Sequence, residues 1–426
     1  MAGLSENFST QQYFSRYCYT TLKDFKLNPF KRCTMRNQRE YEYDIKKMEL
    51  SGKPYKGIKQ KSVFNSLSHF NLFDFGMPPC IAHDLFLGCF NYDLMLIFRG
   101  LTKRKLIGET YLKNRINFLM KKLGLNSQIT LNFKKKAISS KAIDVWHLIR
   151  IVPFIFLKIP YLYKSKLFQL VLLLKKITDL ITAPTISPQQ IGSLKLCIEH
   201  YLENRSSMFN SPLKPKHHYL WHYPHLILQF GPLLPFSTLT GERKHSYFKT
   251  ALRHASNFKN ILKLCAERHQ YFQALISEIN PKRFQESIIC NSGVATCEHL
   301  KDSDKKHLES FGMINHALKY TKSITFRGDC YNVGDFLFVA YDKSGEQFYV
   351  IELKGFILGA DIHELYIYGS YILVEPIIER GINILDKEKD KFECMLLNSL
   401  PDITPLKIYE CDGKRYLFQK HAFPWQ

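Results

Sequence analysis

Apolar residues recur at helical spacing through residues 101–209, with only scattered glycine and proline. The segments VWHLIRIVPFIF and LFQLVLLLKKITDLI are typical of buried helices, because aliphatic side chains occur on more than one face of each turn. Pro184 and Pro188 interrupt the pattern. We therefore expect an all-helical block with breaks at these two prolines.

Lysines at positions 158, 164 and 166 interrupt the most apolar windows of this block. Neither window reaches the ~20 uninterrupted apolar residues that a bilayer span requires. We expect these windows to be buried helices of a soluble protein, with no membrane partner.

From Tyr320 onward apolar and polar residues alternate instead, as in ITFRGDCYNVGDFLFVAYDKSGEQFYVIELKGFIL. Turn signals at Gly328-Asp329 and at residues 343–345 separate the alternating runs, and Asp412-Gly413 predicts a hairpin. We expect a small antiparallel β domain, SH3-like or a barrel, in this part of the chain.

Two further helices are predicted between these regions, at Lys216–Gln229 and Glu242–Ile279, separated by a Gly231-Pro232 turn. Polar residues 286–304 lose the apolar periodicity and indicate a linker. The whole pattern divides the chain into residues 1–100, 101–211, 212–285, a linker at 286–319, and 320–426.

The chain has 60 Lys and Arg against 38 Asp and Glu over 426 residues, a formal net charge of +22. An excess of this size indicates a polyanionic partner, most commonly nucleic acid, because solubility requires a much smaller charge. The 11 cysteines lack regular spacing, and residues 1–10 show no signal peptide. We therefore expect a reducing compartment and no disulfides.

Histidines, basic residues and one acid beside a histidine, Glu242 with His245, gather in residues 212–270, a stretch that otherwise has the pattern of buried structure. KHHYLWHYP, FGPL and ERKHSYFK follow one another there. In this order the three motifs closely resemble the C-terminal catalytic block of transposases of the CACTA (En/Spm-like) class carried by animal mobile elements. The resemblance extends upstream through residues 56–94 to the aromatic run at 13–18, and covers roughly the first two thirds of the chain.

The resemblance implies a ribonuclease H-like α/β fold, here a remnant carrying the all-helical insertion. It also implies two-metal phosphoryl transfer, in which three carboxylates hold a pair of Mg²⁺ ions. Glu242 falls on the acid of the last motif. For the middle acid, the class has an Asp three residues before a His, but here Cys80 stands three residues before His83. Asp84, directly after this histidine, is the only carboxylate in the motif. Each acid has an alternative role at the first turn of a helix.

In the class, the first catalytic acid lies upstream of the zinc motif. Residues 1–14 are all that precede the motif in this sequence, and Glu6 is the single acid among them. We therefore expect an incomplete catalytic centre, and whether the chain is an enzyme stays open. Leu87 also replaces a class glutamate. Together these losses indicate a degenerate or domesticated copy.

The resemblance further implies a structural zinc site that joins Cys-x-x-Cys to a pair of histidines. His218 and His222 keep the second half, but the first half reads Ser15-Arg16-Tyr17-Cys18. A three-ligand site of Cys18, His218 and His222 is one interpretation, Cys33 as the missing thiolate is another, and hydrogen-bonded core histidines are a third. His83 is a further candidate metal ligand.

The candidate DNA contacts lie on the predicted helix after residue 242, where the spacing of Lys249 and Arg253 places both on one face. Such cations hold phosphates and fix position rather than read bases. Their alternative role is an ordinary solvated helix face. The full set is Lys244, His245, Lys249, Arg253 and Lys259.

The leading interpretation is a transposon-derived, transposase-like nuclear protein that binds duplex DNA and lacks catalysis of its own. The alternative is a domesticated chromatin or nucleic-acid scaffold whose C-terminal β domain docks a protein partner. A third, an unrelated RNA-binding protein, requires exposed aromatics on a sheet, for which residues 331–349 are the candidates.

Overall fold

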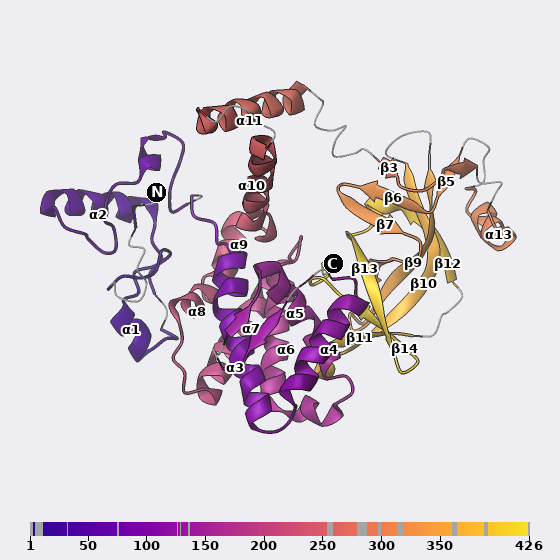
Figure 1. Ribbon diagram of the computed structural model, residues 1–426, viewed down its shortest axis with the longest axis horizontal. Helices are drawn as coiled ribbons and strands as arrows, with labels where there is room; N and C mark the ends of the chain where they lie inside the picture. Colours follow the sequence, from indigo (N-terminus) through magenta and orange to yellow (C-terminus); the bar gives the residue numbers. More distant parts are fainter. Residues whose placement is uncertain are drawn as a thin grey trace. The chain divides into compact units, whose positions relative to one another are not determined.

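The computed structural model divides into two compact units, Met1–Leu239 and Thr240–Gln426 (Figure 1). It combines helices with a large antiparallel C-terminal sheet, so the predicted α/β class is confirmed at this level. The structure describes residues 3–4, 12–31, 33–74, 76–125, 127, 129–134, 137–253 (only the backbone at 240–243), 259–278, 288–296, 300–313, 318–359, 364–386 and 391–424.

The N-terminal part of the first unit holds helices α1 (Leu22–Leu27) and α2 (Gln38–Ser51) and the 3₁₀ turn η1 (Val63–Ser66). Short polar side chains cap both α-helices: Thr21 accepts from the amide of Asp24, and Asn37 accepts from that of Glu40. One face of α2 packs into a small core of Tyr41, Ile45, Met48, Ile58 and Leu72.

The middle of the first unit is a helical assembly in which the predicted buried helices are confirmed (Figure 1). Helices α5 and α6 contain the two most apolar segments, and most of their side chains are buried. A break follows α6 at Pro184, and Pro188 opens α7 behind the Ser187 capping box, as expected. The elements are η2 (Ala82–Cys89), α3 (Phe90–Lys103), α4 (Glu109–Lys122), α5 (Ala142–Ile155), η3 (Pro160–Lys164), α6 (Lys166–Ile181) and α7 (Pro188–Met208).

The block is not entirely helical, and here the prediction is wrong. Strands β1 (Thr130–Asn132) and β2 (Ala137–Ser139) form an antiparallel pair between α4 and α5. Each strand buries one aliphatic side chain, Leu131 or Ile138, between more exposed neighbours. That alternation has the period of a strand, and it is too short to stand out within a helical background.

The continuous helical stretch Ala82–Lys103, formed by η2 and α3, is long and apolar enough by composition to cross a membrane. More than half of its most apolar window, 56%, is buried inside the protein. Core helices commonly share these properties, so the stretch is weak evidence for a membrane segment.

The helix predicted at Lys216–Gln229 is two helices, α8 (Pro215–Leu220) and α9 (Tyr223–Phe230), separated at Trp221 and His222. Pro224 lies in the first turn of α9, where its missing amide hydrogen removes no helical hydrogen bond. Helix α9 ends at Gly231, whose φ of 78° is readily accessible only to glycine. The 3₁₀ turn η4 (Leu234–Phe236) then leads to α10 (Thr238–Arg253).

The second unit begins within α10, and α11 (Ile261–Glu278) follows, so that there are two helices where the sequence predicts one. Residues 254–258 between them lie outside the described part. The range predicted as a linker contributes β3 (Ile288–Cys290), β4 (Ala295–Thr296) and α13 (Asp302–Ser310).

The β-rich region forms a nine-stranded antiparallel sheet, in the order β12-β10-β11-β14-β13-β8-β9-β5-β4, and a three-stranded sheet, β3-β6-β7. An additional β9–β10 pairing links the two arms of the larger sheet. The strands are β5 (Lys319–Thr321), β6 (Ser323–Phe326), β7 (Asp329–Asn332), β8 (Phe336–Tyr341), β9 (Phe348–Leu358), β10 (Leu365–Ile377), β11 (Ile382–Leu385), β12 (Lys391–Leu396), β13 (Asp402–Cys411) and β14 (Lys414–Phe418); η6 (Ile378–Arg380) and η7 (Leu397–Ser399) are short 3₁₀ turns.

The hairpin predicted at Asp412-Gly413 is confirmed: Cys411 pairs with Lys414, and the two turn residues have φ of 52° and 71°. Two consecutive positive φ angles give the turn the twist that matches the flanking strands. The turn near Gly328 lies one residue earlier than expected, because Phe326 pairs directly with Asp329.

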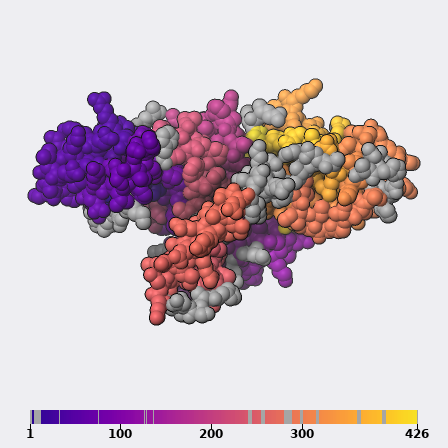
Figure 2. All heavy atoms as spheres, turned by 90° about the horizontal axis from the view of Figure 1, so that it is seen from above, coloured from indigo at the N-terminus to yellow at the C-terminus, as the bar shows by residue number. Residues whose placement is uncertain are grey.

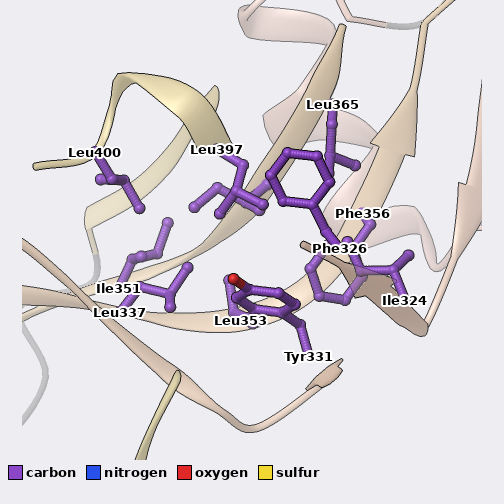
Figure 3. Packing of buried hydrophobic residues seen from close by; sticks show 11 residues of the cluster. Ile324, Phe326, Tyr331, Leu337, Ile351, Leu353, Phe356, Leu365, Leu397 and Leu400 are labelled. Carbon is purple, nitrogen blue, oxygen red and sulfur yellow. The ribbon is translucent and has the colours of Figure 1, made fainter. Parts of the chain in front are cut away.

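Aromatic and aliphatic side chains from several strands fill the interior of this region (Figure 3). Tyr331 is completely buried, and Phe336, Phe338 and Phe348 are also buried. Core packing therefore accounts for most of the aromatics that the RNA-binding alternative requires on an open face. The cluster in Figure 3 comprises Ile324, Phe326, Tyr331, Leu337, Ile351, Leu353, Phe356, Leu365, Ile367, Leu397 and Leu400.

We expect Leu353→Ala to lower the free energy of unfolding by about 2–5 kcal/mol, because it removes a fully buried side chain and leaves a cavity. Ile378→Ala is the matched control, since Ile378 is 84% exposed. Chemical denaturation followed by circular dichroism measures both. Equal effects of the two substitutions would contradict the assigned core.

Candidate metal centre

Helix α8 and the turn after it direct two histidines to one place. His218 and His222 are four residues apart, which keeps them on the same side of a helical backbone. Their Nε2 atoms lie 3.0 Å apart, and both side chains are buried. Two imidazole nitrogens thus face each other inside the protein.

Two cysteines reach the same place from the N-terminal segment. An antiparallel bridge pairs Cys18 with Met35, and the amide of Tyr19 donates to the carbonyl of Thr34 at 3.1 Å. This pairing brings Cys33 close to Cys18 although 14 residues separate them in sequence.

The four side chains form a Cys2His2 group that could hold a metal ion. The two Sγ atoms and two histidine nitrogens all lie within 4.8 Å of one another, and Cys18 Sγ is 3.2 Å from His218 Nε2. A tetrahedral zinc ion with Zn–S of ~2.3 Å and Zn–N of ~2.0 Å requires ligand atoms roughly 3.3–3.8 Å apart. The donor set is one that zinc prefers, and the His218–His222 and Cys18–His218 separations of 3.0 and 3.2 Å lie just below this range. Cys18, Cys33, His218 and His222 are therefore the residues that would hold the ion.

The surroundings of the group favour a thiolate. The amide of Thr20 donates to Cys18 Sγ at 3.4 Å. Burial opposes ionisation of Cys18, but hydrogen bonds from Cys33, His218 and His222 hold its pKa well below the usual range. The pKa of Cys33 is raised, because its thiol donates to the Cys18 sulfur and is partly buried. Burial lowers the pKa of His222 and keeps a nitrogen lone pair available.

Packing fixes the ligands in position. The rings of Phe14 and Phe25 lie 5.2 and 5.5 Å from the His218 ring, and Tyr17 lies 5.5 Å from that of His222. Arg36 donates to the carbonyl of Cys18 at 3.2 Å and so anchors the Cys18 backbone. The histidines and Cys18 are therefore buried in a pocket lined by aromatic rings.

Of the alternatives that the sequence leaves open, the arrangement corresponds to the one with Cys33 as the second thiolate. Ser15, which stands where the class has its first cysteine, accepts the amide hydrogens of Tyr17 and Cys18 at 3.3 Å. It therefore shapes the loop and is not among the four ligands. His83 also lies outside the group, beside Cys80 and Thr238.

The neighbouring residue in α8 faces a different, equally buried centre. His217 is rotated by about 100° from His218. Its Nδ1 accepts from the amide of Lys214 at 2.9 Å, so Nε2 carries the hydrogen that bonds Asp93 at 2.8 Å. Tyr201 donates to the same carboxylate at 2.5 Å, and Arg205 at 3.2 Å.

Asp93 is thus a carboxylate inside a helix core with three donors around it. Burial opposes ionisation, yet His217, Arg205 and Tyr201 lower the pKa of Asp93 below its ordinary value. The sequence motifs did not predict this hydrogen-bond network. The signal for it in the sequence is an acid directly before the apolar run Leu94–Phe98 of helix α3.

Asp84, the proposed middle metal-binding acid, forms an ion pair with Arg16. Burial raises the pKa of Asp84, and Arg16, Lys216 and His83 oppose that effect. The carboxylate is therefore both buried and engaged by a guanidinium. Its geometry is that of a structural pair and does not resemble an open Mg²⁺ ligand.

The remaining predicted site residues lie on or beside α10. Glu242 belongs to α10, but its side chain lies outside the described part of the structure. The five proposed DNA contacts are exposed: Lys244, His245, Lys249, Arg253 and Lys259.

No protein-family model matches the chain, and no curated protein matches it either. The transposase class therefore stays a prediction from the sequence motifs.

We expect the chain to bind one Zn²⁺, and Cys33→Ser to weaken binding by more than the roughly 10–100-fold typical of a partner outside the ligand set, because a ligand is lost. Competition with a chromophoric chelator measures the affinity. His225→Ala is the control, since His225 is exposed and lies outside the group. Unchanged affinity in Cys33→Ser would contradict the four-ligand centre.

We expect Asp93→Asn to cost about 3–5 kcal/mol at neutral pH, because buried Arg205 loses its counter-charge. Since folding lowers the pKa of Asp93, its contribution is complete above the unfolded value of ~3.9 and is lost as the pH falls through the lower folded value. Guanidinium unfolding should therefore show that the difference in free energy of unfolding between wild type and Asp93→Asn shrinks as the pH falls through this range. Exposed Glu203→Gln on α7 is the control, and a gap unchanged by acid would refute the assignment.

Proposed function

We propose that this protein is a transposase-derived, nuclear, duplex DNA-binding protein in which zinc has a structural role and which lacks strand-transfer activity of its own. The ordered KHHYLWHYP, FGPL and ERKHSYFK motifs support the origin. The net charge of +22 supports a polyanionic partner.

The observation that carries the proposal is the cationic face of α10. His245, Lys249 and Arg253 follow one another at four-residue intervals, and all three are exposed. Lys244 and Lys259 are exposed as well. Lys249 and Arg253 thus place two cations along one side of the helix, with the His245 ring one turn before them. Such a row can meet successive phosphates of a duplex.

Packing between α10 and α11 supports this orientation of the cations. Tyr247 donates to the carbonyl of Arg268 at 3.2 Å, and its ring lies 5.5 Å from that of Phe272. Arg268 in turn donates to the carbonyl of Ala251 at 3.0 Å. The aromatic side of α10 is thus held against α11, whose surface is open to view in Figure 2, and the cations remain available.

The proposed zinc ion would have a structural role: it would balance the negative charge of the cysteine thiolates and hold the four ligands in fixed positions, without taking part in a reaction. Its four protein ligands would fill a tetrahedral shell, which is the pattern of structural zinc sites. Those ligands connect the N-terminal segment to α8 and would hold the first unit together.

We further propose that the first unit descends from a ribonuclease H-like domain, and that its ancestor carried out two-metal strand transfer. In the described part of that unit the strands are the β1–β2 pair and isolated bridges. Asp84 is held by Arg16. Both observations favour a protein that binds DNA over one that cleaves it, and the scaffold alternative differs only in adding a protein partner for the β region.

We expect affinity for random duplex DNA to fall steeply with salt concentration, because bound phosphates release counterions. Lys249→Glu combined with Arg253→Glu should weaken binding and reduce the slope of log K against log salt by about 2, close to 0.9 per lost phosphate contact. Fluorescence anisotropy with a labelled duplex measures both quantities.

Lys343→Glu combined with Lys414→Glu is the matched control, because it makes the same charge change at two exposed positions of the β region. An equal loss of slope in the control would reduce the effect to net charge. Salt-insensitive binding by the wild-type chain would refute the DNA proposal.

A further inference from the structure

Cys80, His83 and Thr238 converge in the first unit, away from the four metal-ligand side chains. Cys80 Sγ lies 3.2 Å from His83 Nδ1 and 2.9 Å from Thr238 Oγ1. Thr238 Oγ1 is also 3.1 Å from His83 Nδ1. The three polar atoms form a closed triangle in which sulfur has two hydrogen-bonding neighbours.

The fold places this sulfur at the start of a long helix. Cys80 follows Pro78 and Pro79, and its carbonyl accepts the amide hydrogen of Asp84 at 2.9 Å, which opens the helical stretch that runs to Lys103. Amide groups at a helix N-terminus lack carbonyl partners within the helix and favour negative charge nearby. Thr238 is itself the first residue of α10.

The environment stabilises a thiolate. Although burial raises the pKa of Cys80, side-chain and backbone hydrogen bonds from Thr238 and His83 hold it below its ordinary value. Lys216 donates to the carbonyl of His83 at 2.6 Å and so ties the His83 backbone to α8. Asp84 next to His83 is neutralised by Arg16.

Two cysteines outside the metal-ligand group, Cys89 and Cys330, provide a contrast. Cys89 lies in the same helical stretch but is fully buried, and burial raises the pKa of its thiol. Cys330 is exposed on β7. The Cys89 thiol donates to the carbonyl of Asp84, and the Cys330 sulfur accepts from the side-chain amides of Asn291 and Asn332. Cys80 differs from both because it is half-buried and its sulfur lies beside an exposed imidazole and a hydroxyl.

We propose that Cys80 is a reactive-thiol modification site, activated by His83 and Thr238, and that hydrogen peroxide is the class of oxidant it takes. The sulfur electron pair attacks one peroxide oxygen, an S–O bond forms as the O–O bond breaks, and hydroxide leaves. The sulfur is oxidised to sulfenic acid, and the peroxide is reduced to hydroxide, which takes up a proton to give water. This inference is independent of DNA binding.

The experiment exposes the full-length protein to a small excess of hydrogen peroxide at pH 7.5, traps sulfenic acid with dimedone, and measures each cysteine by mass spectrometry over time. We expect Cys80 to be trapped roughly tenfold faster than exposed Cys330, since thiolate character controls the rate. His83→Ala and Thr238→Val should each slow Cys80 several-fold and leave Cys330 unchanged.

Free imidazole added to His83→Ala should restore part of the Cys80 rate, which a purely structural role of His83 would not allow. His69→Ala, an exposed histidine elsewhere in the first unit, is the control and should leave the rate unchanged. Circular dichroism confirms that each variant is folded, and His83→Gln replaces any alanine variant that is not. Cys80 reacting no faster than Cys330, or equally fast without His83, would overturn the proposal.

Discussion

The N-terminal unit depends on the meeting of two thiols and two imidazoles in one buried pocket. Cys18 and His218 are 200 positions apart, yet their ligand atoms lie 3.2 Å from each other. Four electron-rich donors in a pocket shielded by aromatic rings are stable together only when shared protons or a cation lie among them. The centre therefore sets where the N-terminal segment docks, and the chain between its two halves folds within that limit.

The buried polar chemistry of the unit is organised in pairs of opposite charge. Asp93 is surrounded by donors from α7 and α8, and Asp84 is paired with Arg16 from the N-terminal segment. Each pair satisfies charges that would be costly to bury alone. These two acids occupy the helical stretch Ala82–Lys103, and Cys80 lies just before its first residue. The two structural carboxylates and the proposed reactive thiol therefore belong to one continuous segment of the chain.

Much of the fold could be predicted from the sequence where a single period dominates. The apolar segments of α5 and α6, the breaks at the prolines and the Asp412-Gly413 hairpin follow from local rules that tertiary contacts reinforce. The β1–β2 pair could not be found in this way, because each strand buries one side chain and needs its partner to exist. The break between α8 and α9 was hidden because residues on both sides of it fit a helical pattern.

The metal centre was only partly predictable for a similar reason. His218 and His222 are the pair that the transposase resemblance implies. Cys33 was one of several alternatives, because its position beside Cys18 depends on a strand-like bridge that spacing does not reveal. Asp93 was missed because its hydrogen-bond donors are more than 100 positions away in the sequence, and no local pattern around Asp93 identifies them. Long-range pairing of polar groups is set by the assembled core, which single-sequence patterns do not describe.

Helix α8 is short, yet it has no rotational freedom. Adjacent histidines anchor it in two directions about 100° apart, one toward sulfur and one toward a carboxylate. Inserting or deleting one residue before His217 within the helix would turn both imidazoles away from their partners at once. The same change in the loop before Lys214 would leave this angular relation intact, so α8 should tolerate length changes beside it far better than length changes inside it.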